Sequence, residues 1–337
     1  MEYGAIDLHT RHSQIRVIDA EGRVVREQRI PTTRERLTEA FAGLGPVRVL
    51  LETGTEREWV AQTLEAAGHA VIVADPNYAP MYGEVRRRVK TDRRDVAALA
   101  EANRRGFYRL AYRRSAPQRA MQQILRTRRQ LVAMRSGTIS LLRSLLRQEG
   151  YRLPSGSSAQ VPTRLATLDI PAALALTLAP LHQTLADLSQ RILAIDARIR
   201  AAVQDDAIVT RLQSVPGVGP VVAVTFRATL DRLDRFREAG QVSALAGLVP
   251  REDSSGERQR RGHITKTGSR ELRSLLIQAA WACWRSRGSG ALRVWAEQLA
   301  ARRGRRIAVV GLARRLSRLL FAIWRDGSTF VPALVAR

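Results

Sequence analysis

The sequence has little cysteine and few aromatic residues, and each shortage excludes a class of site. Cys283 is the only cysteine among 337 residues, so neither a disulfide framework nor a thiolate zinc site can form within one chain. The five histidines are scattered, without the spacing typical of metal ligands. Phe, Trp and Tyr make up only 5% of the residues, so the composition does not favour extensive stacking on unpaired bases.

Long hydrophobic runs are also missing. No window reaches about 18 charge-free apolar residues, so we expect no membrane-spanning segment. The first residues lack the basic and then apolar pattern of a secretory signal. Together with the single cysteine, these absences favour a cytoplasmic protein.

Acidic residues are outnumbered by basic ones. Lys and Arg total 56 against 31 Asp and Glu, which gives a formal net charge of +25. A fold with this imbalance repels itself unless a polyanion neutralises it, and the usual polyanion is nucleic acid. The alternative is the general arginine preference of a GC-rich genome. Because 45% of the residues are apolar, the chain can still bury sizeable cores.

The first third of the chain has the pattern of an α/β layer. Apolar alternation and turn residues predict strands first and then helices between further strands. A helix is expected to begin at Thr32 with capping chemistry, and helical sequence is expected again from about Pro76. The predicted strands cover residues 4–8, 14–19, 23–30, 47–52 and 70–75, and a further helix covers residues 56–67.

The remaining sequence is predicted to be helical. Long amphipathic helices over residues 116–149 and 172–204, joined by a loop near residues 151–163, indicate a coiled-coil arm that packs within the chain or against another copy. Residues 207–330 indicate a compact, all-α module. We therefore expect three domains, comprising residues 1–112, 113–205 and 206–337.

Four carboxylates in the first domain are the strongest candidates for chemistry. Asp7 lies in the first strand and Glu52 ends a buried strand, where sites of open α/β sheets are found. Asp92 and Asp95 are three residues apart and share one helix face. Oxygen donors of this kind suit Mg²⁺ or Mn²⁺ in phosphoryl transfer.

Each carboxylate also has a structural interpretation. Asp92 and Asp95 are typical of a helix N-terminus, where a carboxylate caps backbone amides and meets the positive end of the helix dipole. Asp7 alone is compatible with a turn, and Glu52 alone with an ion pair to arginine. The set is more specific than its members, because its order along the chain is that of ribonuclease-H-like nucleases.

The C-terminal module contains a candidate phosphate-binding turn. Residues 214–225 have the pattern of a helix-hairpin-helix, in which Gly217 and Gly219 expose backbone amides at a helix N-terminus. An ordinary turn between helices is the alternative.

Two clusters of basic residues lie next to the candidate sites. Such runs are usually solvated helix faces, but their position favours contacts to phosphates, with duplexes recognised by shape and backbone. The first cluster comprises Arg86, Arg87, Arg88 and Lys90, and the second comprises Arg258, Arg260, Arg261, Lys266, Arg270 and Arg273.

The motifs together resemble those of the DEDD transposases of the IS110 insertion-sequence family and the related Piv-type DNA invertases. The resemblance covers nearly the whole chain, with motifs in the family's order in two separated regions. It is carried by Gly4–Asp7, Leu51–Thr55, Lys90–Ala100, Ser214–Gly219, Leu245–Pro250, Ser254–Gly256, Gly262–Gly268 and Leu272–Arg273.

This resemblance implies a fold and a mechanism. It implies a ribonuclease-H-like domain, similar to a Holliday-junction resolvase, whose four carboxylates hold the metal. It implies a nucleophilic serine, here Ser255 or the adjacent Ser254, that becomes covalently joined to DNA. It also implies a homodimer or homotetramer with a composite active site, and a structured noncoding guide RNA that pairs with the DNA.

Other functions remain compatible with these residues. A junction-resolvase-type nuclease would use the four carboxylates to activate water, and the C-terminal module would only bind DNA. A basic architectural DNA-binding protein would carry the same charge without catalysis. A transposase and an invertase share the motifs, so the sequence leaves that choice open.

Overall fold

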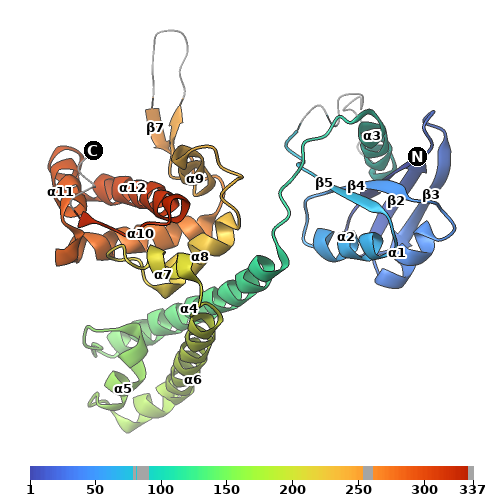
Figure 1. Cartoon of the computed structure of the whole chain (residues 1–337). Helices are drawn as coiled ribbons and strands as arrows, with labels where there is room; N and C mark the ends of the chain where they lie inside the picture. The colour runs from blue at the N-terminus through green and yellow to red at the C-terminus, as the bar shows by residue number, and fades with distance from the viewer. Residues whose placement is uncertain (79–80, 82–90, 253–260, 333–337) are drawn as a thin grey trace. The chain divides into compact units, whose positions relative to one another are not determined.

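The computed structural model describes residues 1–78, 81, 91–252 and 261–332 (Figure 1). These residues form two compact units, Met1–Arg114 and Ser115–Arg337, which are considered one at a time below. Several predicted site residues lie outside the described ranges, namely Arg86, Arg87, Arg88, Lys90, Ser254, Ser255, Gly256, Arg258 and Arg260.

The first unit is built on a mixed five-stranded sheet with the order β3-β2-β1-β4-β5. The first three strands pair antiparallel through short turns, whereas β4 and β5 run parallel to β1. The strands are β1 (Glu2–Asp7), β2 (His12–Ile18), β3 (Val24–Pro31), β4 (Val47–Glu52) and β5 (Ala70–Ala74).

Helices cover both faces of this sheet, as Figure 1 shows, with α1 (Arg34–Phe41) and α2 (Arg57–Ala66) on one face and α3 (Asp92–Arg105) on the other. Successive strand residues point to opposite faces, so each strand contributes to two cores. Ile6 and Leu51 pack under α1 and α2, whereas Ala5 and Leu50 pack under α3. The α/β layer predicted from the sequence is therefore present.

The helix expected from about Pro76 does not begin at that residue, and most of the segment that follows, residues 79–80 and 82–90, lies outside the described residues. Residues 76–78 form a turn in which Asp75 Oδ1 accepts a hydrogen bond from the backbone N–H of Asn77 at 3.0 Å. A side chain that bonds its own backbone in this way competes with helix formation. The next α-helix with described bounds is α3, which begins at Asp92.

Helix α3 is fixed to the sheet by a buried amide. Asn103 has no exposed surface, and its Nδ2 donates to the carbonyl oxygens of Gly4 at 2.8 Å and Arg48 at 2.6 Å. Its Oδ1 accepts from Arg48 Nε at 3.0 Å. These bonds join α3 to β1 and β4, and so set the position of the helix over the two strands that end in Asp7 and Glu52.

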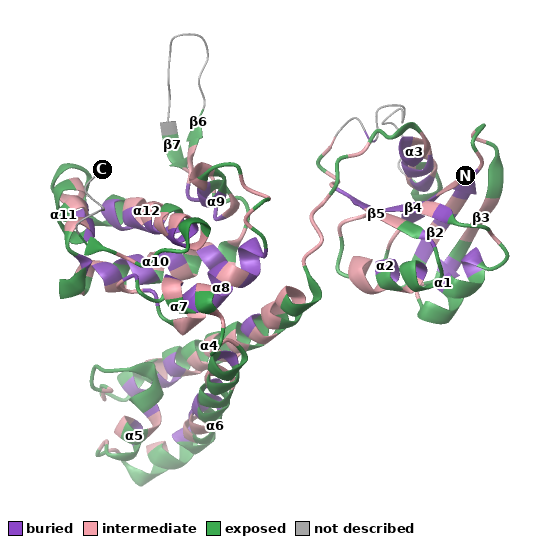
Figure 2. Cartoon of the chain, viewed as in Figure 1, coloured by how far each residue is buried: buried purple, intermediate pink, exposed green. Residues whose placement is uncertain are grey.

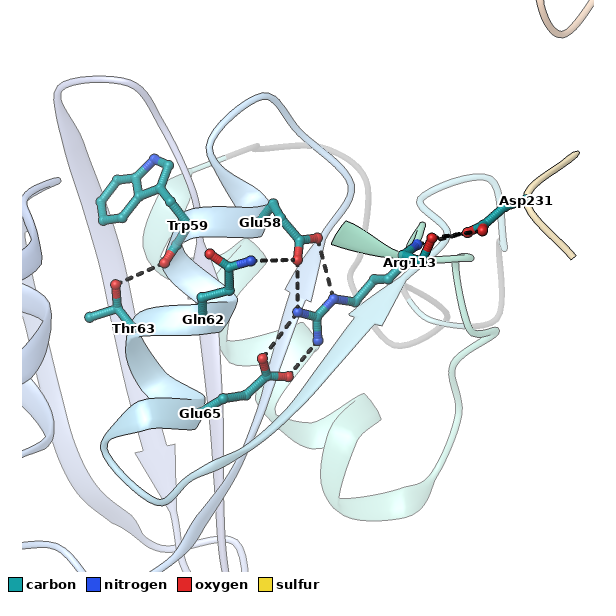
Figure 3. Close-up of polar contacts among 8 residues, drawn as sticks. Glu58, Trp59, Gln62, Thr63, Glu65, Arg113 and Asp231 are labelled. Atoms are coloured by element: carbon teal, nitrogen blue, oxygen red, sulfur yellow. Dashed lines mark hydrogen bonds and ion pairs between the residues drawn. The ribbon is translucent and has the colours of Figure 1, made fainter. Parts of the chain in front are cut away.

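An ion-pair cluster holds the end of the first unit (Figure 3). The Arg113 guanidinium lies between Glu58 and Glu65 of α2, with Nη2 3.1 Å from an oxygen of each carboxylate. The second unit begins with a separate anchor, because Asp231 accepts hydrogen bonds from the backbone N–H and the hydroxyl of Ser115 at 2.7 and 2.8 Å.

The second unit starts with two long helices, α4 (Ala116–Gln148) and α6 (Ala172–Ala202), which pack against each other. Their buried side chains lie on facing stripes, while most other positions are exposed (Figure 2). Arg128 of α4 forms an ion pair with Asp196 of α6. That α4 and α6 form a coiled coil stays a prediction. The loop expected between them contains the short helices η2 (Ser158–Gln160) and α5 (Val161–Ala166).

The rest of the second unit is a helical layer around one large core. Leu125 of α4 and Ile199 of α6 belong to this core, so the long helices are continuous with it. The helices are α7 (Ala207–Leu212), α8 (Pro220–Leu230), α9 (Ala239–Leu245), α10 (Arg270–Arg285), η3 (Arg287–Ser289), α11 (Ala291–Arg303) and α12 (Arg305–Asp326).

The expectation that this part is all-α was wrong. Strands β6 (Pro250–Glu252) and β7 (Arg261–Ile264) pair antiparallel within the region that was predicted to be all-α. The strands are three and four residues long and rich in charge, so they show no apolar alternation from which a strand could be predicted.

Across the described ranges, no helix combines the length and the apolar character needed to cross a bilayer.

The Asn103 contacts predict a large effect of a single substitution. Asn103→Leu keeps the approximate volume but removes the bonds to Gly4, Arg48 and the Arg48 guanidinium, so we expect a loss of about 2–3 kcal/mol in the free energy of unfolding. Urea unfolding followed by circular dichroism measures this loss. The matched control is Gln62→Leu on the exposed face of α2, and equal stability of the two variants would contradict the assigned role.

Candidate functional site

Two of the predicted carboxylates lie at neighbouring strand ends. Ile6 of β1 pairs with Leu51 of the parallel strand β4, so Asp7 and Glu52, one residue further, end the strands side by side. Ala5 and Leu50, two residues earlier, face α3, and the alternation of strand side chains places Asp7 and Glu52 on that same face. The two acids therefore share one edge and one face of the sheet.

The other two carboxylates lie in the first turn of α3, above this face. The helix is capped by Thr91, whose hydroxyl accepts from the backbone N–H of Arg94 at 3.4 Å. Neither Asp92 nor Asp95 occupies the capping position, so capping does not account for them. The positive end of the helix dipole still favours carboxylates in this turn.

The structure adds a residue that the sequence did not indicate. His9 Nε2 lies 3.4 Å from Asp7 Oδ2 and 3.8 Å from Asp92 Oδ1. One ligand atom from each of these three residues lies within 4.8 Å of the others, so the group could hold a metal ion. The available signal was the position of His9, two residues after an acid that ends a strand.

The electrostatics of Asp7 reflect this crowding. Burial raises the pKa of Asp7 above its ordinary value, His9 lowers it, and the negative charges of Asp92 and Asp95 raise it further. The negative charges of two predicted carboxylates, Asp92 and Asp95, therefore act on a third, Asp7. The Asp7 side chain is 18% exposed while those of His9 and Asp92 are 56% exposed, so the cluster is anchored at its base and open to solvent above.

These residues fit a divalent cation. Carboxylate oxygens are the ligands that Mg²⁺ and Mn²⁺ prefer, and an imidazole nitrogen is acceptable to Mn²⁺. A cation would also relieve the repulsion that raises the pKa of Asp7. The donor set therefore matches a metal site of the kind used in phosphoryl transfer.

The predicted hairpin turn lies between α7 and α8, and its two glycines differ. Gly217 has φ +86°, and a Cβ there would lie 2.4 Å from the Ala279 carbonyl oxygen and 2.5 Å from the Cys283 nitrogen. It therefore packs against the backbone of α10. Gly219 is the N-cap of α8 and has open space around it, so any ligand at this turn would approach Gly219.

A second close backbone contact explains two of the family motifs. A Cβ at Gly247 would lie 2.1 Å from the Thr267 carbonyl oxygen, and one at Gly268 would lie 2.2 Å from that of Leu245. The backbone N–H of Lys266 donates to the Gly247 carbonyl at 3.1 Å. Glycine is needed at both positions because the two loops cross in direct backbone contact, at the base of the segment in which Ser255 occurs.

The described basic residues near this crossing differ in how far their side chains are exposed to solvent. Lys266 and Arg270 are exposed, whereas Arg273 donates through Nη1 to the Ala246 carbonyl at 2.9 Å and so supports the loop. Arg261 begins β7, but its side chain lies outside the description.

Comparisons with known proteins agree in both parts of the chain. A DEDD transposase model matches residues 5–150, and the model of the transposase IS116/IS110/IS902 family matches residues 209–294. A probable family 20 transposase of Pseudomonas aeruginosa is 32% identical over 337 residues, 97% of this chain and 98% of that protein. The transposase for insertion sequence element IS1111A of Coxiella burnetii is 28% identical over 96% of this chain and 90% of its own length. The transposase for insertion sequence element IS1328 of Yersinia enterocolitica is 27% identical over 96% and 97%.

The two glycines of the hairpin turn predict effects of alanine that differ in size. Gly217→Ala should lower the free energy of unfolding by more than about 2 kcal/mol, because the methyl group would overlap the α10 backbone at a positive φ. Gly219→Ala should stay within about 1 kcal/mol of wild type. Thermal unfolding of both variants decides the matter, and similar melting temperatures would refute the packing role of Gly217.

The raised pKa of Asp7 predicts how stability depends on pH in metal-free protein. The folded-state pKa of Asp7 lies above the unfolded value of 3.8, so protonation of Asp7 stabilises the fold. This stabilisation is fully present below pH 3.8. It is lost as the pH rises through the folded-state pKa. At pH 7 in EDTA, Asp7→Asn should therefore raise the melting temperature, whereas Glu39→Gln on the exposed face of α1 should not.

The same variants test the metal site. Mn²⁺ should raise the melting temperature of the wild type more than that of Asp7→Asn or His9→Ala, because a ligand that binds only the folded state stabilises it. An unchanged response to Mn²⁺ in both variants would exclude these residues as ligands.

Proposed function

Because the chain belongs to the IS116/IS110/IS902 family of transposases, we propose that it is an insertion-sequence transposase that cleaves and rejoins double-stranded DNA with a divalent metal. The observation that carries the proposal is the crowding of Asp7, His9 and Asp92, with the charge of Asp95 acting on Asp7. Carboxylates held this close in spite of their repulsion are typical of a metal-dependent phosphoryl-transfer site.

We assign the metal-holding role to the four carboxylates, Asp7, Glu52, Asp92 and Asp95. When bound, Mg²⁺ or Mn²⁺ would neutralise charge on the phosphodiester and make its phosphorus more electrophilic. Asp7 supplies a partly buried oxygen donor at the end of β1, and Glu52 supplies a second from the neighbouring strand. His9 orients Asp7 through the contact between Nε2 and Oδ2 and is a candidate for a further ligand.

We assign the nucleophile to Ser255, by resemblance to the family. Its Oγ would attack the phosphorus of a DNA phosphodiester and lose its proton, while the bond to the 3′-oxygen breaks and that oxygen gains a proton. The strand end is then held as a phosphoserine. A 3′-hydroxyl can later attack this phosphoserine, so the energy of the phosphodiester is kept and no nucleotide cofactor is needed.

The proposed acids and the proposed serine belong to different units of the chain. This separation is consistent with a composite site, in which carboxylates from one protomer act with the serine of another in a homodimer or homotetramer. The exposed parts of α4 and α6 are candidates for the assembly contact, as a coiled-coil arm would be.

Nucleic-acid contacts are assigned to the exposed basic residues and to the hairpin turn. The open N-terminus at Gly219 suits a phosphate, and Lys266 and Arg270 are free to reach a DNA backbone. Resemblance extends the proposal to a structured guide RNA bound by the same protein. The other basic residues of the two clusters are proposed to contribute as well. Arg86, Arg87, Arg88 and Lys90 lie close to Asp92 in the sequence, and Arg258, Arg260 and Arg261 lie close to Ser255 in the sequence.

A second candidate function is a structure-specific nuclease. The acidic cluster favours it equally, because a metal site of this kind can activate water without any serine. The two functions differ in one product, since only the transposase forms a covalent bond between protein and DNA.

The covalent intermediate predicts a product that survives denaturation. Wild-type protein incubated with element-end DNA, guide RNA and Mg²⁺ should give a protein–DNA adduct on a denaturing gel, and Ser255→Ala should reduce it at least about 100-fold, as expected when a nucleophile is removed. Asp7→Asn should also abolish it. Ser254→Ala is the matched control and should keep it. Nicked DNA without adduct would favour the nuclease, and an adduct from Ser255→Ala would remove the serine assignment.

A further inference from the structure

A cavity of about 640 Å³ lies in the second unit, and none of the residues assigned above lines it. It is lined by the C-terminal half of α10, by α11 and by the first residue of α12. Trp281, Trp284 and Arg285 line it from α10, Arg293, Glu297 and Ala300 line it from α11, and Arg305 lines it from α12.

Two tryptophans form an aromatic platform in this cavity. The rings of Trp281 and Trp284 stack with 5.8 Å between their centroids and 12° between their planes. Trp284 packs against the core of the unit, so it holds Trp281 in place. Trp281 is still 37% exposed, so a ligand in the cavity can reach part of its ring surface.

The platform is surrounded by positive charge. Arg293 is neutralised by Glu297, since the Nε and Oε1 atoms lie 2.8 Å apart. Arg285 and Arg305 are exposed, and neither has an acidic partner among the residues that the structure describes. The cavity therefore combines a fixed aromatic face with two positive charges, those of Arg285 and Arg305, that could bind an anion.

We propose that this cavity, the Trp281 pocket, binds one unpaired nucleotide. The base stacks on Trp281 and the neighbouring phosphates lie against Arg285 and Arg305. Stacking of bases on aromatic rings beside cationic side chains is the general mode of single-strand recognition. A base within a duplex is already stacked on its neighbours, so a paired nucleotide does not present the face that this pocket needs.

The charges favour a nucleotide over a protein partner. A second copy of this chain carries +25 and is repelled by a cationic pocket, whereas a polyanion is attracted. The pocket is lined by seven residues, whereas a stable protein interface takes about 20–30 residues from each partner. The inference rests on the proposed nucleic-acid function and deepens it, because it predicts an unpaired nucleotide in the DNA or RNA that the protein binds.

An oligonucleotide series tests this pocket. Binding in EDTA is measured by fluorescence anisotropy with a labelled single strand, the same strand with abasic sites, and a duplex of equal length, each as DNA and as RNA. Trp281→Ala should weaken binding of the intact single strand about tenfold, the loss expected for one stacked base, and should leave the abasic strand and the duplex unchanged. Trp281→Phe should restore most of the affinity.

Controls separate the pocket from the fold. Arg305→Gln should weaken the intact and the abasic single strands alike by about threefold, because it removes a phosphate contact, whereas Arg302→Gln on exposed α11 surface outside the pocket should not. If Trp281→Ala fails to fold, Arg305→Gln and its control Arg302→Gln still test the pocket. The strand type with the larger base-dependent loss identifies DNA or RNA as the source of the nucleotide.

The outcomes that overturn the proposal are distinct. If Trp281→Ala weakens the abasic strand and the duplex as much as the intact strand, or weakens none of them, the pocket does not bind a base. If it instead changes the oligomeric mass in size-exclusion chromatography with light scattering, the pocket is a protein contact. If wild type binds the duplex while the pocket variants change nothing, this inference fails alone. If wild type binds no nucleic acid, the proposed function fails as well.

Discussion

Repulsion between carboxylates at one edge of the sheet is the constraint on which the first unit depends. Asp7 is partly buried at the end of β1, and the charges of Asp92 and Asp95 act on it from the first turn of α3. This repulsion favours separation of the carboxylates. The Asn103 bonds to both strands and the Thr91 cap nevertheless hold α3 in place. The fold therefore preorganises a site for positive charge, which is the property that metal-assisted phosphoryl transfer requires.

The second unit meets a different requirement, the presentation of cationic surface by a rigid frame. Gly247 and Gly268 allow two loops to cross in direct backbone contact, and Gly217 allows the hairpin turn to lie on α10. Helix α10 then connects the three regions of interest, because its N-terminus follows the basic segment, and its C-terminal half both supports the hairpin turn and carries Trp281. A single helix thus links the proposed phosphate contacts to the proposed nucleotide pocket.

Much of this arrangement could be predicted from the sequence, because it depends on local periodicity. Apolar alternation placed the five strands to within about two residues, and the end of a buried strand identified Glu52. Features made by contacts between distant segments could not be predicted. His9 meets Asp7 and Asp92 only after folding. The sequence around Gly217 is the same whether this glycine faces a phosphate or packs on α10. Trp281 has the helical spacing of a core residue, although its ring lines a cavity.

The central claim is that the acidic edge of the first unit holds a divalent metal. Anomalous diffraction from crystals soaked in Mn²⁺ tests it most directly, because the method locates the ion without relying on activity. The account predicts a peak about 2.0–2.3 Å from carboxylate oxygens of Asp7 and Asp92, and the loss of that peak in Asp7→Asn crystals. A Mn²⁺ peak that is absent from this edge while the acids pair with arginines would contradict it.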